Sequence, residues 1–312
     1  MRIGLIDVDS HNFPNIALMK WSSYHKAKGD TVEWHIALGG HYDIVYVSKI
    51  FSFSPDYQYP IDADQVVYGG SGYCIGLKDG HEFYDKSKDT PLPYEVEHSF
   101  PDYSIYPQYE GKAYGMLTRG CPRGCSFCHT GVKDGLKSHK VADLKEFWNG
   151  QKEIVLLDQN LLACKDWREL VQQLKDSKSY IDFNGGTDIR LMTDEKAKAL
   201  CELKVKEWHF AWDRYQDKEI IIPKFELFNK YCKKSLKQKI VYTLVNYDTT
   251  LEQDLDRIYT LRDLGYSAYV MVYDKEHLPR GHIYKKLQRW VNNRFVFNTC
   301  KTFDEYLEVM QR

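Results

Sequence analysis

Hydrophobic residues recur along the chain in short runs, most of which end at a polar residue or a glycine. The first run, RIGLID at residues 2–7, has the pattern of a buried strand. Apolar residues at helical spacing over 15–30 predict a helix that ends near Gly29. Further apolar runs predict strands at 31–37, 43–50 and 65–70. A strand, a helix and then more buried strands indicate a small parallel α/β sheet.

The periodicity disappears over residues 71–113. Tyr, Pro, Asp and Gly are frequent there, as in TPLPYEVEHSFPDYSIYP. We interpret this stretch as a connection that wraps between two domains and has no regular elements. The predicted domains are residues 1–110, including this connection, and residues 111–312.

A regular alternation of strands and helices begins after this connection. The predicted strands are 113–118, 153–160, 180–186, 207–213, 239–246 and 267–274. The predicted helices are 141–149, 166–177, 193–204, 223–234 and 251–265. Six strand–loop–helix units in a row predict a parallel sheet that curls into an open (β/α)6 partial TIM barrel. In such folds the chemistry lies on loops at the C-terminal ends of the strands.

Composition excludes several classes of protein. Hydrophobic residues make up 43% of the chain, and the formal net charge is −1. A net charge so close to zero gives no reason to expect electrostatic binding to a nucleic acid or to a membrane. No apolar run approaches the ~18–20 residues of a membrane span, and MRIGLIDVD does not resemble a secretory signal. We expect a cytoplasmic protein with no membrane partner, in which clustered cysteines bind metal or do chemistry. Cysteines in or near helical patterns, expected to fill the core, are Cys164, Cys201 and Cys232.

Three of the eight cysteines fall in one glycine-broken loop, GMLTRGCPRGCSFCHTG at residues 115–131. Their thiolates, from Cys121, Cys125 and Cys128, suit zinc or an iron–sulfur cluster. A structural zinc site normally has four ligands, and His129 is too close behind the third cysteine to be an easy fourth. A cubane cluster held by three thiolates leaves one iron that can bind a substrate or cofactor.

The motif CPRGCSFC, after the first strand of a six-unit βα series, resembles the radical S-adenosylmethionine superfamily. TRGCPRGCSFC resembles in particular its members with an N-terminal cobalamin-binding-like domain. The resemblance implies a [4Fe–4S] cluster on Cys121, Cys125 and Cys128, whose open iron chelates S-adenosylmethionine. Reductive cleavage would give a 5′-deoxyadenosyl radical that abstracts hydrogen from a substrate. It also implies that Phe127 packs on the adenine and that a flavodoxin or ferredoxin donates the electron.

Further candidates for cofactor contacts end the next strands. They are Asp158, Asn160, Gly185, Gly186, Arg190 and Asp213. By resemblance, Asp158 and Asn160 would meet the cofactor's amino group, although the family's Gly-Gly-Glu is absent there. Arg190 could pair with its carboxylate, Asp213 could hold the ribose hydroxyls, and the glycines would admit a ligand close to the backbone. In the alternative, the two aspartates cap helices, Arg190 forms a structural ion pair and the glycines only form a turn.

The N-terminal region resembles the cobalamin-binding fold, a flavodoxin-like parallel sheet. DSHNFP, SKI and YGG occur in family order, so His11 would coordinate cobalt and Ser48, Gly69 and Gly70 would line the nucleotide tail. However, Pro14 stands where glycine is expected, the gaps are short, and no helix follows YGG. We therefore expect a domain of this type that binds no cobalamin.

The sequence thus favours a radical S-adenosylmethionine enzyme with an unidentified substrate. A methyl- or methylthiotransferase is the alternative chemistry, but only Cys74 precedes the motif and residues 276–312 are too few for an RNA-binding barrel. A non-catalytic iron–sulfur or zinc protein is the alternative class. The substrate can be a peptide, a small molecule or a nucleic acid. Residues 231–239 and 285–294 mix basic and aromatic residues as nucleic-acid surfaces do, and as solvated amphipathic helices also do.

Overall fold

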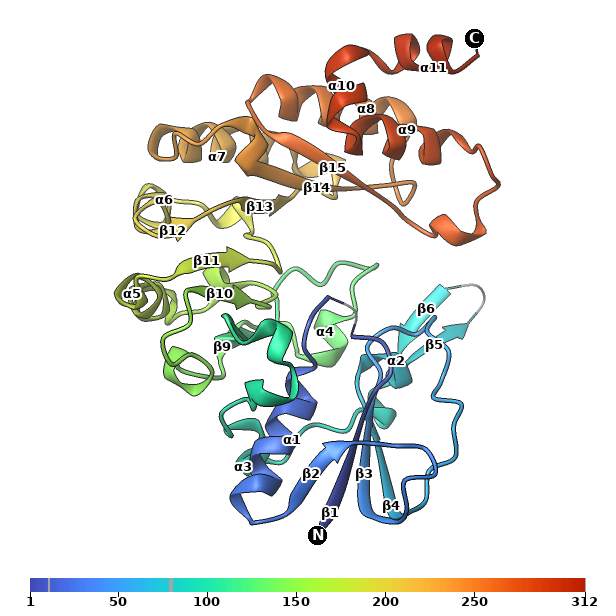
Figure 1. Ribbon diagram of the computed structural model, residues 1–312. Helices are drawn as coiled ribbons and strands as arrows, with labels where there is room; N and C mark the ends of the chain where they lie inside the picture. Colours follow the sequence, from blue (N-terminus) through green and yellow to red (C-terminus); the bar gives the residue numbers. More distant parts are fainter. Residues whose placement is uncertain (11, 79–80, 312) are drawn as a thin grey trace. The chain divides into compact units, whose positions relative to one another are not determined.

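The protein is mixed α/β and contains several parallel sheets (Figure 1). The computed structural model describes residues 1–10, 12–78 and 81–311. The chain divides into two compact units, residues 1–179 and 180–312, and each is described by itself. The domain boundary predicted at residues 110 and 111 falls inside the first unit and stays a prediction. None of the helices in the described ranges is both long enough and apolar enough to span a membrane.

The first unit begins with the predicted parallel sheet. Its strands are β1 (Arg2–Asp7), β2 (Thr31–Trp34), β3 (Tyr42–Ser48) and β4 (Ala63–Gly69), in the order β2-β1-β3-β4. Helix α1 (Ile16–Ala27) is capped by Asn15, whose side chain accepts a hydrogen bond from the Leu18 N–H. Leu18 packs against Ile3 and Leu5 on one face of the sheet. The opposite face is covered by side chains from the segments that follow β3 and β4.

The connection after β4 contains more structure than the sequence pattern predicted. It forms α2 (Ser71–Cys74), an antiparallel pair of β5 (Ile75–Lys78) and β6 (His81–Tyr84), and α3 (Tyr94–Glu97). The prediction that this stretch lacks regular elements is therefore wrong. Each element is only four residues long, too short to produce a recognisable hydrophobic period.

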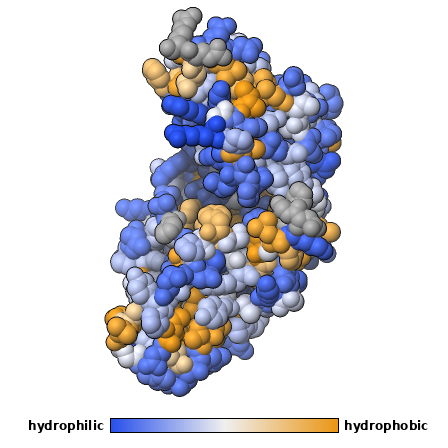
Figure 2. Space-filling view, turned by 90° about the vertical axis from the view of Figure 1, so that its right-hand side faces the viewer, coloured by the Kyte–Doolittle hydropathy of each residue, from blue (hydrophilic) through white to orange (hydrophobic). Residues whose placement is uncertain are grey.

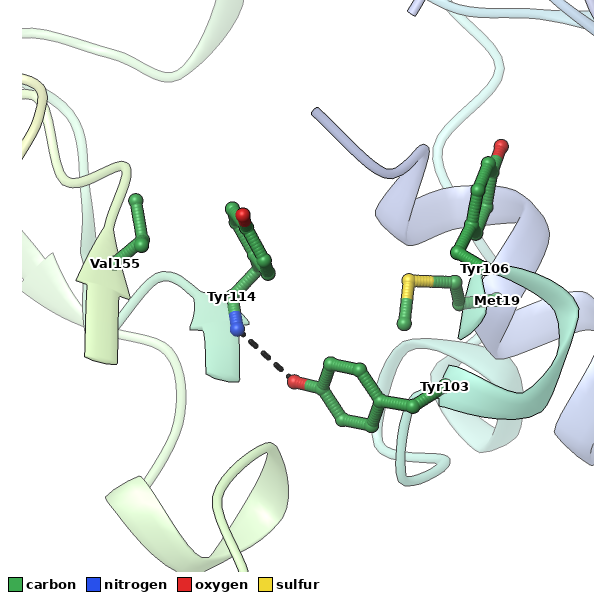
Figure 3. Packing of buried hydrophobic residues seen from close by; sticks show 5 residues of the cluster. All are labelled: Met19, Tyr103, Tyr106, Tyr114 and Val155. Atoms are coloured by element: carbon green, nitrogen blue, oxygen red, sulfur yellow. Dashed lines mark hydrogen bonds between the residues drawn. The ribbon is translucent and has the colours of Figure 1, made fainter. Parts of the chain in front are cut away.

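A cluster of aromatic residues joins this connection to the next part of the first unit (Figure 3). Tyr103 and Tyr106 pack with Met19 of α1 and with Tyr114 and Val155 from two later strands. The Tyr103 hydroxyl accepts a hydrogen bond from the Tyr114 N–H at 2.9 Å. It also donates to the Phe147 carbonyl at 2.8 Å. Burial raises the pKa of Tyr103 to about 12, so the hydroxyl keeps its proton and this donor role at neutral pH.

The rest of the first unit starts the strand–helix alternation. It comprises β7 (Lys112–Gly115), β8 (Thr118–Arg119), α4 (Thr130–Lys133), β9 (His139–Lys140), β10 (Glu153–Leu156) and α5 (Trp167–Ser177). Strands β7 and β10 pair in parallel, with Gly115 opposite Leu156. The helix predicted at 141–149 is wrong, because only a 3-10 turn forms there, at Leu144–Glu146. The N–H groups of Val141 and Ala142 instead bond to the Leu117 carbonyl.

The second unit continues the alternation. Its strands are β11 (Tyr180–Phe183), β12 (Lys204–Val205), β13 (Trp208–Ala211), β14 (Lys239–Val245) and β15 (Ser267–Val272). Its helices are α6 (Asp194–Cys201), α7 (Lys218–Tyr231), α8 (Leu251–Asp263), α9 (Ile283–Asn292), α10 (Arg294–Thr299) and α11 (Phe303–Gln311). Strands β13, β14 and β15 form one parallel sheet. The six strands predicted for the alternation are thus present, as β7, β10, β11, β13, β14 and β15.

The core of the second unit is strongly aromatic. Trp208 and Phe210 of β13 point to the same side and contact Phe228 of α7, and Phe210 also contacts Phe225. All four side chains are buried. At the surface drawn in Figure 2, hydrophobic residues form separate patches among hydrophilic ones.

We expect Tyr103→Phe to lower the free energy of unfolding by roughly 1–3 kcal/mol, because a buried N–H and a buried carbonyl both lose this partner. Denaturant unfolding measures the change. Tyr109→Phe is the matched control: Tyr109 is half-buried, and the described residues offer its hydroxyl no hydrogen-bond partner. Equal stability of the two variants would show that the Tyr103 hydroxyl does not hold the connection in place.

Candidate functional site

The cysteine loop lies between two short strands that close its base. Strands β8 and β9 pair antiparallel, with Thr118 opposite Lys140 and Arg119 opposite His139. The Cys121 N–H then bonds to the Gly135 carbonyl at 3.1 Å. Gly120 has a φ of +86°, and a Cβ there would lie 2.3 Å from the Lys137 carbonyl oxygen. Glycine is therefore required immediately before the first cysteine.

Three consecutive side chains after β10 hold the start of this loop. Asp158 accepts hydrogen bonds from the Leu117 N–H at 3.1 Å and from the Thr118 N–H and hydroxyl, both at 2.6 Å. Gln159 accepts from the Gly120 N–H at 3.2 Å and donates to Asp134 at 3.0 Å. Asn160 places its amide nitrogen 3.5 Å from the Cys121 sulfur. The segment DQN thus fixes the chain from the end of β7 to the first cysteine.

The Asp158 carboxyl is the one charged group of this segment, and only 4% of the residue is exposed. Burial raises its pKa to about 6, and the hydrogen bonds from Thr118 and Leu117 oppose that shift. Its hydrogen-bond partners, Leu117 and Thr118, precede the first cysteine and do not belong to the first turn of the next helix. Asp158 therefore anchors the loop, a role that neither sequence interpretation named.

Solvent reaches the three cysteines of the loop to different degrees. Cys121 and Cys125 are half-buried and Cys128 is exposed. The Cys128 N–H bonds to the Cys125 carbonyl at 3.0 Å, which folds the last two cysteines into one turn. His129 turns away toward Glu82, with its Nε2 3.6 Å from the carboxylate. Phe127 is half-buried in this turn.

Three cysteine side chains on one loop are a donor set whose chemistry fits an iron–sulfur cluster. Among residues 1–10, 12–78 and 81–311, however, no three His, Cys, Asp or Glu side chains converge as metal ligands. The agreement with an iron–sulfur site therefore rests on the three cysteines as ligand types and on the hydrogen bonds that hold the start of the loop. Outside the loop, Cys164 and Cys232 are buried as predicted, while Cys201 is half-buried.

In the second unit, Gly185 and Gly186 follow β11 in a turn. The Gly186 N–H bonds to the Phe183 carbonyl at 2.9 Å, and Gly186 has a φ of +82°. Only His209 O, at 3.8 Å, would lie near a Cβ added there. The positive φ and not crowding therefore accounts for glycine at position 186.

Arg190 and Asp213 both lie among charged groups of the second unit. The Arg190 Nε is 2.8 Å from Asp188 and its Nη1 is 2.8 Å from Asp217. These are the ion pairs that the alternative interpretation expected, and a role in cofactor binding stays a prediction. Asp213 accepts from the Leu244 N–H at 3.1 Å. Burial raises the pKa of Asp213, and Arg257 and Arg190 oppose that shift.

Arg257, which was not among the predicted site residues, is a fully buried arginine at the same strand ends. Its Nη1 donates to the carbonyls of Trp212 and Asp213 at 2.6 and 2.7 Å. Its Nη2 donates to the Leu244 carbonyl at 2.6 Å and pairs with buried Asp254. This clamp ties the end of β13 to the end of β14. The sequence does contain a sign that Arg257 is buried, because the helical period places it on the same face of α8 as Ile258 and Leu261.

Of the four residues that resemble a cobalamin site, His11 lies outside the described residues. The other three contact neighbouring parts of the same unit. The Ser48 hydroxyl accepts a hydrogen bond from the Asn15 amide at 2.8 Å. The Gly69 carbonyl accepts from the Lys49 N–H, and a Cβ at Gly70 would lie only 2.2 Å from the Lys49 carbonyl oxygen. These contacts show how Ser48, Gly69 and Gly70 are used within the chain, and the expectation that the domain binds no cobalamin stays a prediction.

We expect Asp158→Asn to destabilise the protein by roughly 1–3 kcal/mol, because an amide nitrogen would face a backbone N–H and leave it unsatisfied. It should also speed alkylation of Cys121, since the loop start loses its anchor. Denaturant unfolding and mass-spectrometric thiol labelling measure the two effects. Asp176→Asn, at an exposed position of α5, is the control and should change stability by less than ~0.5 kcal/mol. The same labelling rate in both variants would contradict an anchoring role.

Comparison with models of protein families and with curated proteins gives no match for this chain.

Proposed function

We propose that the protein is a radical S-adenosylmethionine enzyme. The observation that carries the proposal is the cysteine loop itself. Its C-x3-C-x2-C spacing begins beyond the C-terminal end of β7, and the DQN segment after β10 fixes its first residues. Parallel α/β folds place their reactive groups at this edge of the strands.

Cys121, Cys125 and Cys128 would hold a [4Fe–4S] cluster. When bound, the cluster supplies one electron for the cleavage of S-adenosylmethionine to a 5′-deoxyadenosyl radical, which abstracts hydrogen from the substrate. The chain's own contribution is to position the cysteines that would hold the cluster. Asp158 keeps the backbone at 117–118 in one conformation, and this limits the positions that the first thiolate can take.

The remaining assignments follow the same proposal. Phe127 would pack on the adenine of the cofactor. Asn160, whose amide nitrogen is 3.5 Å from the Cys121 sulfur, would meet the cofactor's amino group. Gly185, Gly186, Arg190 and Asp213 would supply contacts from the second unit. In this proposal the six strands form an open (β/α)6 barrel preceded by a flavodoxin-like domain. A flavodoxin or ferredoxin would donate the electron.

Contacts within the N-terminal sheet bear on the type of reaction. Since Ser48 and Gly70 are used by the chain itself, we propose a reaction that needs only the cluster and S-adenosylmethionine. Cobalamin-dependent methyl transfer is correspondingly disfavoured. The proposed chemistry is hydrogen abstraction without methyl transfer, on a peptide, a small molecule or a nucleic acid.

The test is the formation of 5′-deoxyadenosine. Chain reconstituted anaerobically with iron and sulfide should bind about four of each. It should release 5′-deoxyadenosine when given dithionite and S-adenosylmethionine. We expect replacement of Cys121, Cys125 and Cys128 by alanine to abolish the product and the absorbance of the cluster. Chromatography and metal analysis of the same samples measure both.

Cys300→Ala is the matched control, since this half-buried cysteine lies outside the loop; it should keep the iron content and the product. Full iron content in the triple variant would refute the site. A protein that binds iron but forms no 5′-deoxyadenosine, or that binds only stoichiometric zinc, would point instead to a non-catalytic role.

A further inference from the structure

Two long stretches of the second unit contain no acidic residue. Residues 227–247, between Glu226 and Asp248, carry only basic charges. Residues 277–303, between Glu276 and Asp304, do so as well. The basic residues are Lys230, Lys233, Lys234, Lys237 and Lys239 in the first stretch and Arg280, Lys285, Lys286, Arg289, Arg294 and Lys301 in the second. Such runs usually attract an anionic partner when the fold brings them together.

The fold does bring these two stretches together. Arg294, at the start of α10, donates from its Nη2 to the Lys237 carbonyl at 3.2 Å. Lys237 belongs to the turn between α7 and β14, which also carries Lys233 and Lys234. We call Lys233, Lys234, Lys237 and Arg294 the basic patch. Three of them are exposed, and Lys234 is half-exposed.

The charges of the basic patch are not balanced by carboxylates. Lys233 donates to the Asn229 carbonyl at 3.2 Å and Arg294 donates to a carbonyl, and among the described residues neither has an acidic partner. By contrast, Lys218 in the same unit lies 2.5 Å from Asp256. Burial, together with repulsion from Lys233, lowers the pKa of neighbouring Lys239. The uncompensated positive charge is therefore local and favours a polyanion.

An exposed aromatic ring adjoins the basic patch. Phe295 follows Arg294 directly, and 80% of the residue is accessible to solvent. An aromatic side chain next to cations that can follow a phosphate backbone is the arrangement by which proteins bind unpaired bases. A base in a duplex is already stacked, so this ring selects single strands.

We propose that the basic patch binds single-stranded nucleic acid, with phosphates on its cations and a base stacked on Phe295. This binding does not depend on the radical chemistry proposed above. It assigns a function to the two basic and aromatic segments that the sequence singled out.

The test is the binding of a fluorescein-labelled 20-nucleotide RNA of mixed sequence, and of the matching DNA, to the full chain without cluster. Fluorescence anisotropy at several salt concentrations gives the affinity and its salt dependence. We expect Lys237→Ala with Arg294→Ala to reduce the slope of log K against log salt by about 1.4, since each phosphate contact in a single strand contributes ~0.7. Phe295→Ala should weaken binding roughly 5- to 100-fold.

Lys198→Ala is the control, because this exposed lysine of α6 lies between acidic residues in the sequence; it should leave the affinity and the slope unchanged. Thermal melting checks that each variant is folded.

Binding of phosphatidylserine vesicles without binding of either oligonucleotide would overturn the proposal. So would a duplex that binds as tightly as the single strands and is unaffected by Phe295→Ala, or patch variants that bind like the control. Preference for RNA or for DNA would identify the natural ligand.

Discussion

The buried carboxylate of Asp158 is the constraint on which the geometry of the cysteine loop depends. It accepts three hydrogen bonds from Leu117 and Thr118, two residues that precede the first cysteine. A carboxylate so deeply buried costs free energy unless its lone pairs are satisfied. The chain meets this requirement with backbone N–H groups, which as a result cannot move independently of β10.

The parallel pairing of β7 and β10 makes this contact possible. Because Gly115 lies opposite Leu156, both strands end at the same level, and the segments that follow them leave the same edge of the pair. The aromatic cluster around Tyr103 fixes β7 and β10 in turn against α1. The N-terminal part of the first unit therefore supports the strands that precede the loop through packing.

How far the sequence predicts this structure depends on the range of the interactions. Strands such as β1 and β14 are recognisable because their apolar runs are local. The cysteines were recognisable from their spacing. The partners of Asp158 lie about 40 residues away, so no local pattern reveals them. The contact of residues 141 and 142 with the Leu117 carbonyl is also distant in sequence, and no local pattern reveals it.

The central claim is that three thiolates hold a cluster and leave one iron open to S-adenosylmethionine. Electron paramagnetic resonance of the dithionite-reduced protein tests it most directly, because the spectrum of a [4Fe–4S] cluster responds to the ligands of its irons. We expect the signal to change when S-adenosylmethionine is added and to be absent when Cys125 is replaced by alanine. A reduced cluster whose spectrum is identical with and without S-adenosylmethionine would contradict the claim.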